Sequence, residues 1–242
     1  MSMGAPIEVL SGRARHSIES LLSRSDVGIG ESVVAEYIER GWWSERSAVD
    51  FLRHQATVRP NEPALIDFDG YRITFAQLDS LTDAMAANFL YHGIGPGDFV
   101  ALQLPNWSDF FVAMLGAAKV SAVTVNLHMT YLGRELEDIL ERTEAKALIV
   151  PTRWHGKDYE AMSHQAQSHL RHLRLIVATR GRPTHRDTVS FAAMLEPPSR
   201  FERVDLESVR PTGFDPLVAL VSSGTTGRPK LALHTHGSFL YG

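Results

Sequence analysis

The sequence predicts an α/β protein with a mostly parallel sheet flanked by helices. Short apolar runs alternate with amphipathic helical patterns at least three times between residues 99 and 179, as they do in βαβ units. The apolar runs are nearly continuous, which is typical of parallel strands buried on both faces. The composition, with 44% hydrophobic and 21% charged residues, fits a globular chain. We expect residues 1–30 to be a flexible lead-in and residues 31–242 to carry the fold.

The segment before the sheet is expected to form two short helices and a hairpin. Trp42 and Trp43 follow the first helical pattern, and we interpret them as a packing anchor. Asp-Gly is a frequent two-residue hairpin turn, and Ser is a favoured helix cap. The expected elements are a helix from Glu31 to Gly41, a helix over 48–58 capped by Ser47, and β-rich runs at 63–68 and 71–75 joined by Asp69-Gly70.

The sheet and its helices follow in regular alternation. Thr74 and Gln77 have the spacing of a capping box and open a long helix that Gly93 ends. Asn106 is expected to cap the next helix, with Asp109 as an acidic residue in its first turn. We expect strands over 99–104, 122–127, 146–150, 173–179 and 216–221; helices over 75–93, 108–120, 132–144 and 154–170; and a Pro/Arg-rich surface connector over 180–215 with one short helix near 190–195.

Charge and composition exclude several classes of protein. The chain has 24 Lys+Arg and 28 Asp+Glu, a net charge of −4, so we expect no nucleic-acid partner. It has no cysteine, which excludes a disulfide scaffold, a thiolate zinc site and a cysteine nucleophile. This fits a reducing compartment, and we expect a cytoplasmic protein. No apolar run reaches the roughly 18 residues that a membrane span needs.

The strand over 216–221 runs directly into the string SSGTTGRPK at residues 222–230, and a second β-like run follows at 231–236. In open α/β sheets, ligands bind beyond the carboxyl ends of the strands. Glycines let backbone N–H groups point at anionic oxygens, hydroxyls add donors, and a lysine adds a point charge. The string therefore suits a polyphosphate. The residues predicted to bind phosphate are Ser222, Ser223, Gly224, Thr225, Thr226, Gly227 and Lys230.

The string has two other interpretations. A solvated loop accounts for any few of these residues, but the complete string between two β runs is far more specific. The phosphate loop of P-loop NTPases requires G-x-x-x-x-G-K-[ST] followed by a helix. Here Lys230 follows Gly227 by three residues and precedes Leu231 and further β-type residues, which disfavours that class.

The string SSGTTGRPK, followed by HTH, resembles the phosphate-binding signature of the adenylate-forming superfamily. This group contains the acyl- and aryl-CoA synthetases, the luciferases and the adenylation domains of peptide synthetases. The resemblance covers residues 33–242. It includes EYIERGWW and SAVDFL, similar to the opening segment of members that activate aryl and alicyclic acids, and the blocks 62–106 and 110–150. The second block departs from the usual Gly-Ala and Pro-x-Asn-Pro-like pattern at Ser121-Ala122 and at 125–128.

The resemblance implies an ATP-dependent carboxylate–CoA ligase. Such an enzyme converts a carboxylate and Mg²⁺-bound ATP to acyl-AMP and pyrophosphate, and then transfers the acyl group to coenzyme A. An aryl-AMP ligase that loads a carrier protein stays open, as does a truncated, non-catalytic fragment that binds nucleotide or a partner. Residues 222–230 would hold the β- and γ-phosphates, and His236 would border the nucleotide or acyl site.

Members of the superfamily are much longer than 242 residues. We therefore expect an N-terminal fragment, truncated after the phosphate loop and inactive alone, with no catalytic residue and no metal ligand of its own. The helix that begins near His236 would then expose apolar side chains. These are Phe239, Leu240 and Tyr241.

Other polar clusters have simpler explanations than a site. Three histidines in one helical pattern have spacings that do not converge on a metal, and we expect a solvated face. His234 and His236 are interpreted as a structural pair beside the loop. The three histidines with helical spacing are His164, His169 and His172. An acidic cluster, interpreted as the solvent-exposed face of a helix, consists of Glu135, Glu137, Asp138 and Glu141.

Overall fold

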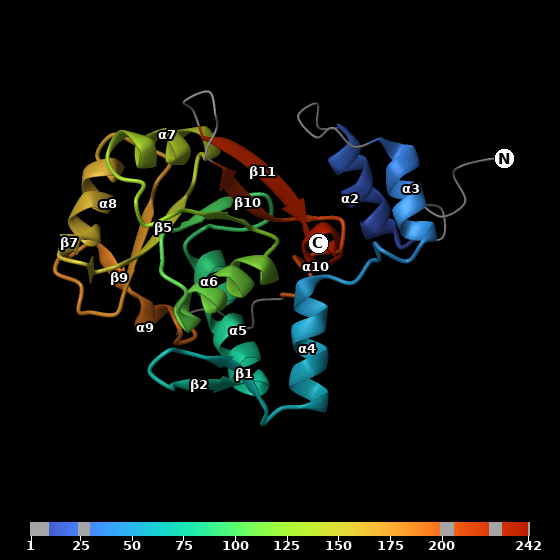
Figure 1. Cartoon of the computed structure of the whole chain (residues 1–242), viewed down its shortest axis with the longest axis horizontal. Helices are drawn as coiled ribbons and strands as arrows, with labels where there is room; N and C mark the ends of the chain where they lie inside the picture. Colours follow the sequence, from blue (N-terminus) through green and yellow to red (C-terminus); the bar gives the residue numbers. More distant parts are fainter. Residues whose placement is uncertain (1–9, 24–29, 199–205, 223–228, 242) are drawn as a thin grey trace.

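The computed structural model describes residues 10–23, 30–198, 206–222 and 229–241. Its centre is a sheet with strand order β11-β10-β4-β3-β5-β8-β9 (Figure 1). Neighbouring strands are parallel, except that β11 is antiparallel to β10. The predicted α/β class is confirmed. The strands are β3 (Phe99–Leu102), β4 (Val123–Asn126), β5 (Ala147–Pro151), β8 (Leu175–Thr179), β9 (Thr188–Ser190), β10 (Pro216–Ser222) and β11 (Lys230–Thr235).

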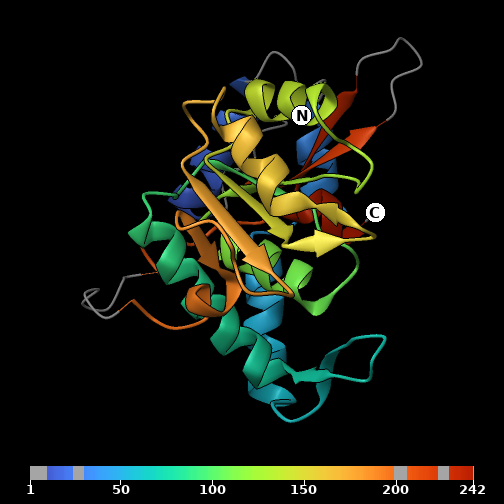
Figure 2. The ribbon, with the colours of Figure 1, turned by 90° about the vertical axis from the view of Figure 1, so that its left-hand side faces the viewer.

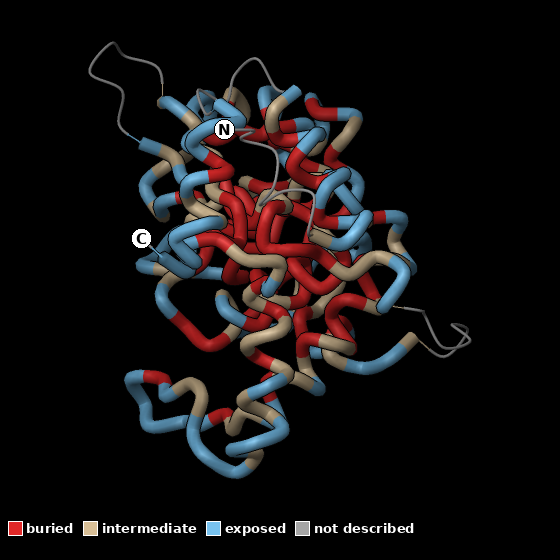
Figure 3. The backbone as a smooth tube through the Cα atoms, turned by 90° about the vertical axis from the view of Figure 1, so that its right-hand side faces the viewer, coloured by how far each residue is buried: buried red, intermediate tan, exposed pale blue. Residues whose placement is uncertain are grey.

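Helices cover both faces of this sheet (Figures 1 and 2). Alternate residues of β3 show the arrangement: Val100 and Leu102 belong to one apolar cluster, and Ala101 belongs to the other. The buried residues therefore gather in the middle of the molecule (Figure 3). The first cluster joins the sheet to α4 (Ala48–Val58), α5 (Phe75–Tyr91), α6 (Ser108–Lys119) and α9 (Phe191–Met194), and the second joins it to α7 (Arg134–Thr143) and α8 (Tyr159–Gln167).

Side chains of the N-cap residues cap α4, α5, α8 and α9, whereas the N-cap residues of α3 (Glu31–Glu39), α6 and α7 make no side-chain cap bond. Ser47 and Asp50 form a capping box on α4, and Thr74 and Gln77 form one on α5, as predicted for the second. The prediction that Asn106 caps α6 is wrong, because the N-cap is Trp107 and it makes no side-chain cap bond. The cap comes instead from a residue distant in the sequence.

That distant cap is Asp67, which follows the first strand of the hairpin β1 (Pro63–Ile66) and β2 (Arg72–Thr74). Its carboxylate accepts a hydrogen bond of 2.7 Å from the backbone N–H of Ser108. It also pairs with Arg180, directly after β8, which in turn bonds Asp109 at 2.7 Å. Burial tends to raise the pKa of Asp67, but Arg180 and Ser108 hold it below its ordinary value. The network ties the hairpin to the main sheet.

The helix expected over 154–170 starts later than predicted. A small hairpin of β6 (Arg153–Trp154) and β7 (Lys157–Asp158) occupies its first turn, and α8 begins only at Tyr159. The hairpin turns at His155 and Gly156, whose φ angles of 48° and 77° are incompatible with a right-handed helix. The connector over 180–215 also differs, because β9 lies within it and pairs with β8.

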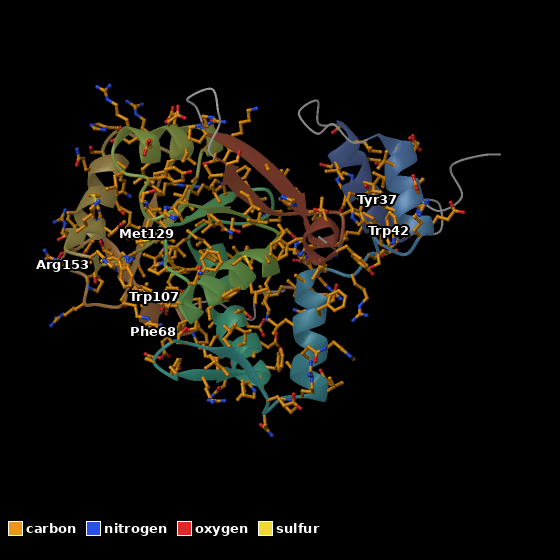
Figure 4. The ribbon with its side chains drawn as sticks, in the orientation of Figure 1. Tyr37, Trp42, Phe68, Trp107, Met129 and Arg153 are labelled. Atoms are coloured by element: carbon orange, nitrogen blue, oxygen red, sulfur yellow. The ribbon has the colours of Figure 1, made fainter. Side chains whose placement is uncertain are left out.

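The segment expected as a lead-in contains helix α2 (Gly12–Ser23), and α3 (Glu31–Glu39) follows it. Both pack on Trp43, whose ring lies 6.4 Å from that of Phe214, so the prediction that the tryptophans anchor this segment is confirmed for Trp43. Tyr37 belongs to α3 and Trp42 follows that helix, and both lie on the opposite side of the molecule from Arg153 (Figure 4). No helix in the described ranges is long and apolar enough to cross a membrane.

Candidate functional site

The signature string lies between two strands, as predicted, and these strands pair with each other. β10 ends at Ser222, β11 starts at Lys230, and these two residues are directly opposite in the antiparallel register. Ser223, Gly224, Thr225, Thr226 and Gly227 lie outside the described residues. The structure thus fixes where the string begins and ends, and its binding role stays a prediction.

Lys230 starts an edge strand, and this leaves its side chain exposed. Residues of β10 become more exposed toward its carboxyl end: Ala219 is buried between the layers, whereas Ser222 is exposed. The polar end of the hairpin therefore emerges from the sheet toward solvent. This is the environment that a phosphate contact needs.

A side chain that the sequence did not suggest reaches the end of the string. Arg142, in the last turn of α7, donates a hydrogen bond of 2.7 Å from Nη1 to the carbonyl oxygen of Pro229. The two residues are 87 positions apart. A helical pattern with a basic last turn is ordinary, so the sequence carries no signal for this contact.

A cavity of about 580 Å³ opens at the carboxyl ends of β3, β4 and β10. Asn126, at the end of β4, has a buried Oδ1 with no hydrogen-bond partner among the described residues. Gln103 stiffens the wall, because its amide donates to the carbonyl oxygens of His128 and Tyr131 at 3.1 and 2.6 Å. Apolar and polar side chains share the lining, which is formed by Leu104, Pro105, Asn106, Phe110, Asn126, Leu127, His128, Met129, Tyr131, Leu220 and Val221.

His236 is fully buried where β11 passes into α10 (His236–Tyr241). Its Nδ1 accepts a hydrogen bond of 3.2 Å from the backbone N–H of Ala48, and its Nε2 has no partner within the described ranges. Burial lowers the pKa of His236 to about 4, although Asp215 and Asp50 act to raise it. His236 does not line the cavity described above. That it borders a ligand stays a prediction.

The helix that His236 opens exposes three large side chains. Phe239 is 42% exposed, Leu240 38% and Tyr241 57%. The expectation that these residues are exposed is therefore confirmed for the chain described here.

The other histidines act in structural contacts. His164, expected on a solvated face, is half-buried instead: it stacks on His185 with ring centroids 3.7 Å apart and bonds Thr188. Burial lowers the pKa of His164, and the charge of His185 lowers it further. Among the described residues, no group of three His, Cys, Asp or Glu side chains is placed to hold a metal.

The model of the AMP-binding enzyme family matches residues 52–242, most of the chain. The chain belongs to this family. The matched region contains the string at 222–230 and every element of the main sheet, including the β10–β11 hairpin.

Two curated relatives and one solved structure place the chain among AMP-binding enzymes. It is 30% identical to the 2-hydroxy-7-methoxy-5-methyl-1-naphthoate–CoA ligase of Streptomyces carzinostaticus, over 87% of this chain and 38% of that protein. It is also 30% identical to the medium-chain fatty-acid–CoA ligase of Escherichia coli, over 85% and 36%. The apo structure of Mycobacterium smegmatis MbtA aligns with a TM-score of 0.73 and 31% identity, over 85% and 37%.

The chain thus spans less than two-fifths of the length of these AMP-binding relatives.

Proposed function

We propose that the chain is the phosphate-binding part of an adenylate-forming ligase that activates a carboxylic acid with Mg·ATP and passes the acyl group to coenzyme A. The observation that carries the proposal is the pairing of Ser222 with Lys230, which places a hydroxyl- and glycine-rich string between two strands at the sheet edge. The names of the curated relatives, a naphthoate–CoA ligase and a fatty-acid–CoA ligase, support the reaction class.

The chemical task of this part follows from charge. In the adenylation step a carboxylate oxygen attacks the α-phosphorus of ATP, the bond from that phosphorus to the bridging oxygen breaks, and pyrophosphate leaves. Both reactants are anions, so catalysis depends on positioning and on stabilisation of the phosphate charge. In this proposal Ser222, Ser223, Thr225 and Thr226 donate hydrogen bonds to the β- and γ-phosphates. Gly224 and Gly227 allow close approach, and Lys230 supplies the positive charge.

Two alternatives are kept because they predict different outcomes. An aryl-AMP ligase makes the same kind of acyl-AMP but transfers the acyl group to a carrier protein, and the segment 36–43, which resembles the opening of aryl-activating members, fits both reactions. A non-catalytic fragment binds Mg·ATP without reaction. His236 is retained in the proposal as a residue near the ligand.

The test uses pyrophosphate exchange. The native protein from its source is assayed for carboxylate-dependent exchange of labelled pyrophosphate into ATP, with naphthoate, salicylate, benzoate and octanoate as substrates. Exchange with one acid, followed by acyl-CoA formation on addition of coenzyme A, is the expected result. Exchange without acyl-CoA favours the carrier-protein alternative. Mg·ATP binding without exchange for any acid contradicts the ligase proposal and favours the non-catalytic fragment.

A further inference from the structure

Arg142 holds the end of the signature from outside the string. Its Nη1 donates to the Pro229 carbonyl at 2.7 Å, one residue before Lys230. Leu231 and Leu233 of β11 pack against the apolar cluster to which Leu136, Ile139 and Leu140 of α7 also belong. The hairpin and α7 therefore share one apolar cluster, and one charged hydrogen bond joins them at the polar end of the hairpin. α7 lies beside that end (Figures 1 and 2).

The bond has the features of a positioning contact. A guanidinium that donates to a carbonyl makes a charge-assisted hydrogen bond, stronger than one between neutral groups. Asp138, one turn earlier on α7, lies 3.4 Å from the same Nη1 and orients it. The side chain of Arg142 is 34% exposed, so the contact is partly shielded from water.

We propose that Arg142 is a positioning residue for nucleotide binding: it fixes the backbone at Pro229 and Lys230, so that the Lys230 side chain starts from a defined point. The inference rests on the proposed function, because it concerns the lysine assigned to the phosphates. A flexible lysine stem delivers its charge well only if its Cα is held, and small misplacements of binding groups are costly. Arg142 itself does not touch the phosphates in this proposal.

Arg134 provides a matched control. It lies at the first residue of the same helix and is exposed. Arg134→Ala removes the same charge from the same helix without removing the bond to Pro229. Any effect of the overall positive field appears in both variants, whereas an effect of positioning appears only in Arg142→Ala.

The experiment measures hydrogen exchange and Mg·ATP affinity on the 242-residue chain. Exchange is followed by mass spectrometry in peptides that cover 216–235. We expect Arg142→Ala to speed exchange at the start of β11 about tenfold and to weaken Mg·ATP binding about tenfold, as for the loss of one charge-assisted bond. Arg134→Ala should leave both unchanged. Arg142→Lys keeps the aliphatic stem and the positive charge. It therefore tests whether the effects of Arg142→Ala on hydrogen exchange and on Mg·ATP affinity come only from the lost packing of that stem.

Each outcome decides a separate question. Unchanged exchange in Arg142→Ala overturns the positioning role. Faster exchange with unchanged Mg·ATP affinity overturns its link to the nucleotide, as do equal losses of affinity in the two alanine variants. If the wild-type chain binds no Mg·ATP, the proposed function fails, and the exchange data alone still decide whether Arg142 fixes the hairpin.

Discussion

Ser222 and Lys230 lie directly opposite each other in the antiparallel pairing of β10 and β11. The first and last residues of the signature are thus brought together by the sheet, independently of any ligand. β10 is itself held by parallel pairing with β4. The ends of the string therefore start from the rigid part of the molecule, a favourable arrangement for a preorganised anion site.

The first prediction concerns the charge of Lys230. Lys230→Ala should weaken Mg·ATP binding to the chain about 10- to 100-fold, because one charge-assisted contact contributes about 1.5–3 kcal/mol. Isothermal titration calorimetry measures the change. Lys157→Ala, which removes an exposed lysine on β7, is the control and should bind as the wild type does. Equal affinity in the two variants would refute the assignment of Lys230.

The second prediction concerns pH and His236. Its pKa of about 4 in the folded chain lies below the ordinary value of 6.5, so the unfolded chain binds an extra proton between these pH values. The contribution of His236 to the free energy of unfolding should therefore be fully present above pH 6.5 and should be lost as the pH drops toward 4. The loss from this group between pH 7.5 and 5 is about 2 kcal/mol.

Urea unfolding at pH 7.5 and 5 measures this loss in the wild type and in His236→Gln. The glutamine variant has no titrating group at this position, so its pH dependence should be smaller by that amount. An identical pH dependence in the two proteins would show that His236 titrates normally when folded.

The third prediction concerns close packing beneath α10. A Cβ added at Gly213 would meet the carbonyl oxygen of Ser44 at 1.9 Å, and backbone there has little room to move. Gly213→Ala should lower the free energy of unfolding by about 2–4 kcal/mol through steric overlap. Gly12→Ala is the control, because its Cβ meets nothing within 4 Å. Thermal melts of both variants decide the matter, and equal melting temperatures would contradict it.

The fourth prediction concerns the cap that Asp67 provides for α6. Asp67→Asn should cost about 1–3 kcal/mol, since a buried carboxylate with charged and backbone donors is replaced by a neutral amide. The lowered pKa of Asp67 means that the wild type keeps this stabilisation above its ordinary pKa of 3.8 and loses it as the pH falls further. Asp69→Asn, whose carboxylate lies 3.9 Å from Arg180 and is 47% exposed, should change little. Denaturant unfolding at pH 7 compares the two, and a larger loss for Asp69→Asn would be contrary to this account.

The sequence predicted those parts of the fold that depend on local pattern. The apolar strands, the capping box at Thr74 and the hairpin at Asp69-Gly70 follow from neighbouring residues. What it missed depends on contacts between distant residues: Asp67 caps α6 from 41 positions away, and Arg142 reaches Pro229 across 87. The small hairpin before α8 was missed for another reason, since the helical pattern outweighed the Gly156 turn signal.

For the candidate site, the sequence predicted the string and its place between two strands, but not its surroundings. The cavity at the ends of β3, β4 and β10 forms because β10 pairs with β4, although β5, β8 and β9 lie between these two strands in the chain. The burial of His236 could not be foreseen either, because it depends on the docking of Ala48 against it.

The most direct test of the central claim compares the binding of nucleotides that differ only in their phosphates. If residues 222–230 hold the β- and γ-phosphates, calorimetry on the wild-type chain should show Mg·ATP binding at least about 100-fold tighter than AMP, with inorganic pyrophosphate competing for the same site. Binding of AMP as tight as that of Mg·ATP, or Mg·ATP binding that pyrophosphate does not displace, would contradict the claim.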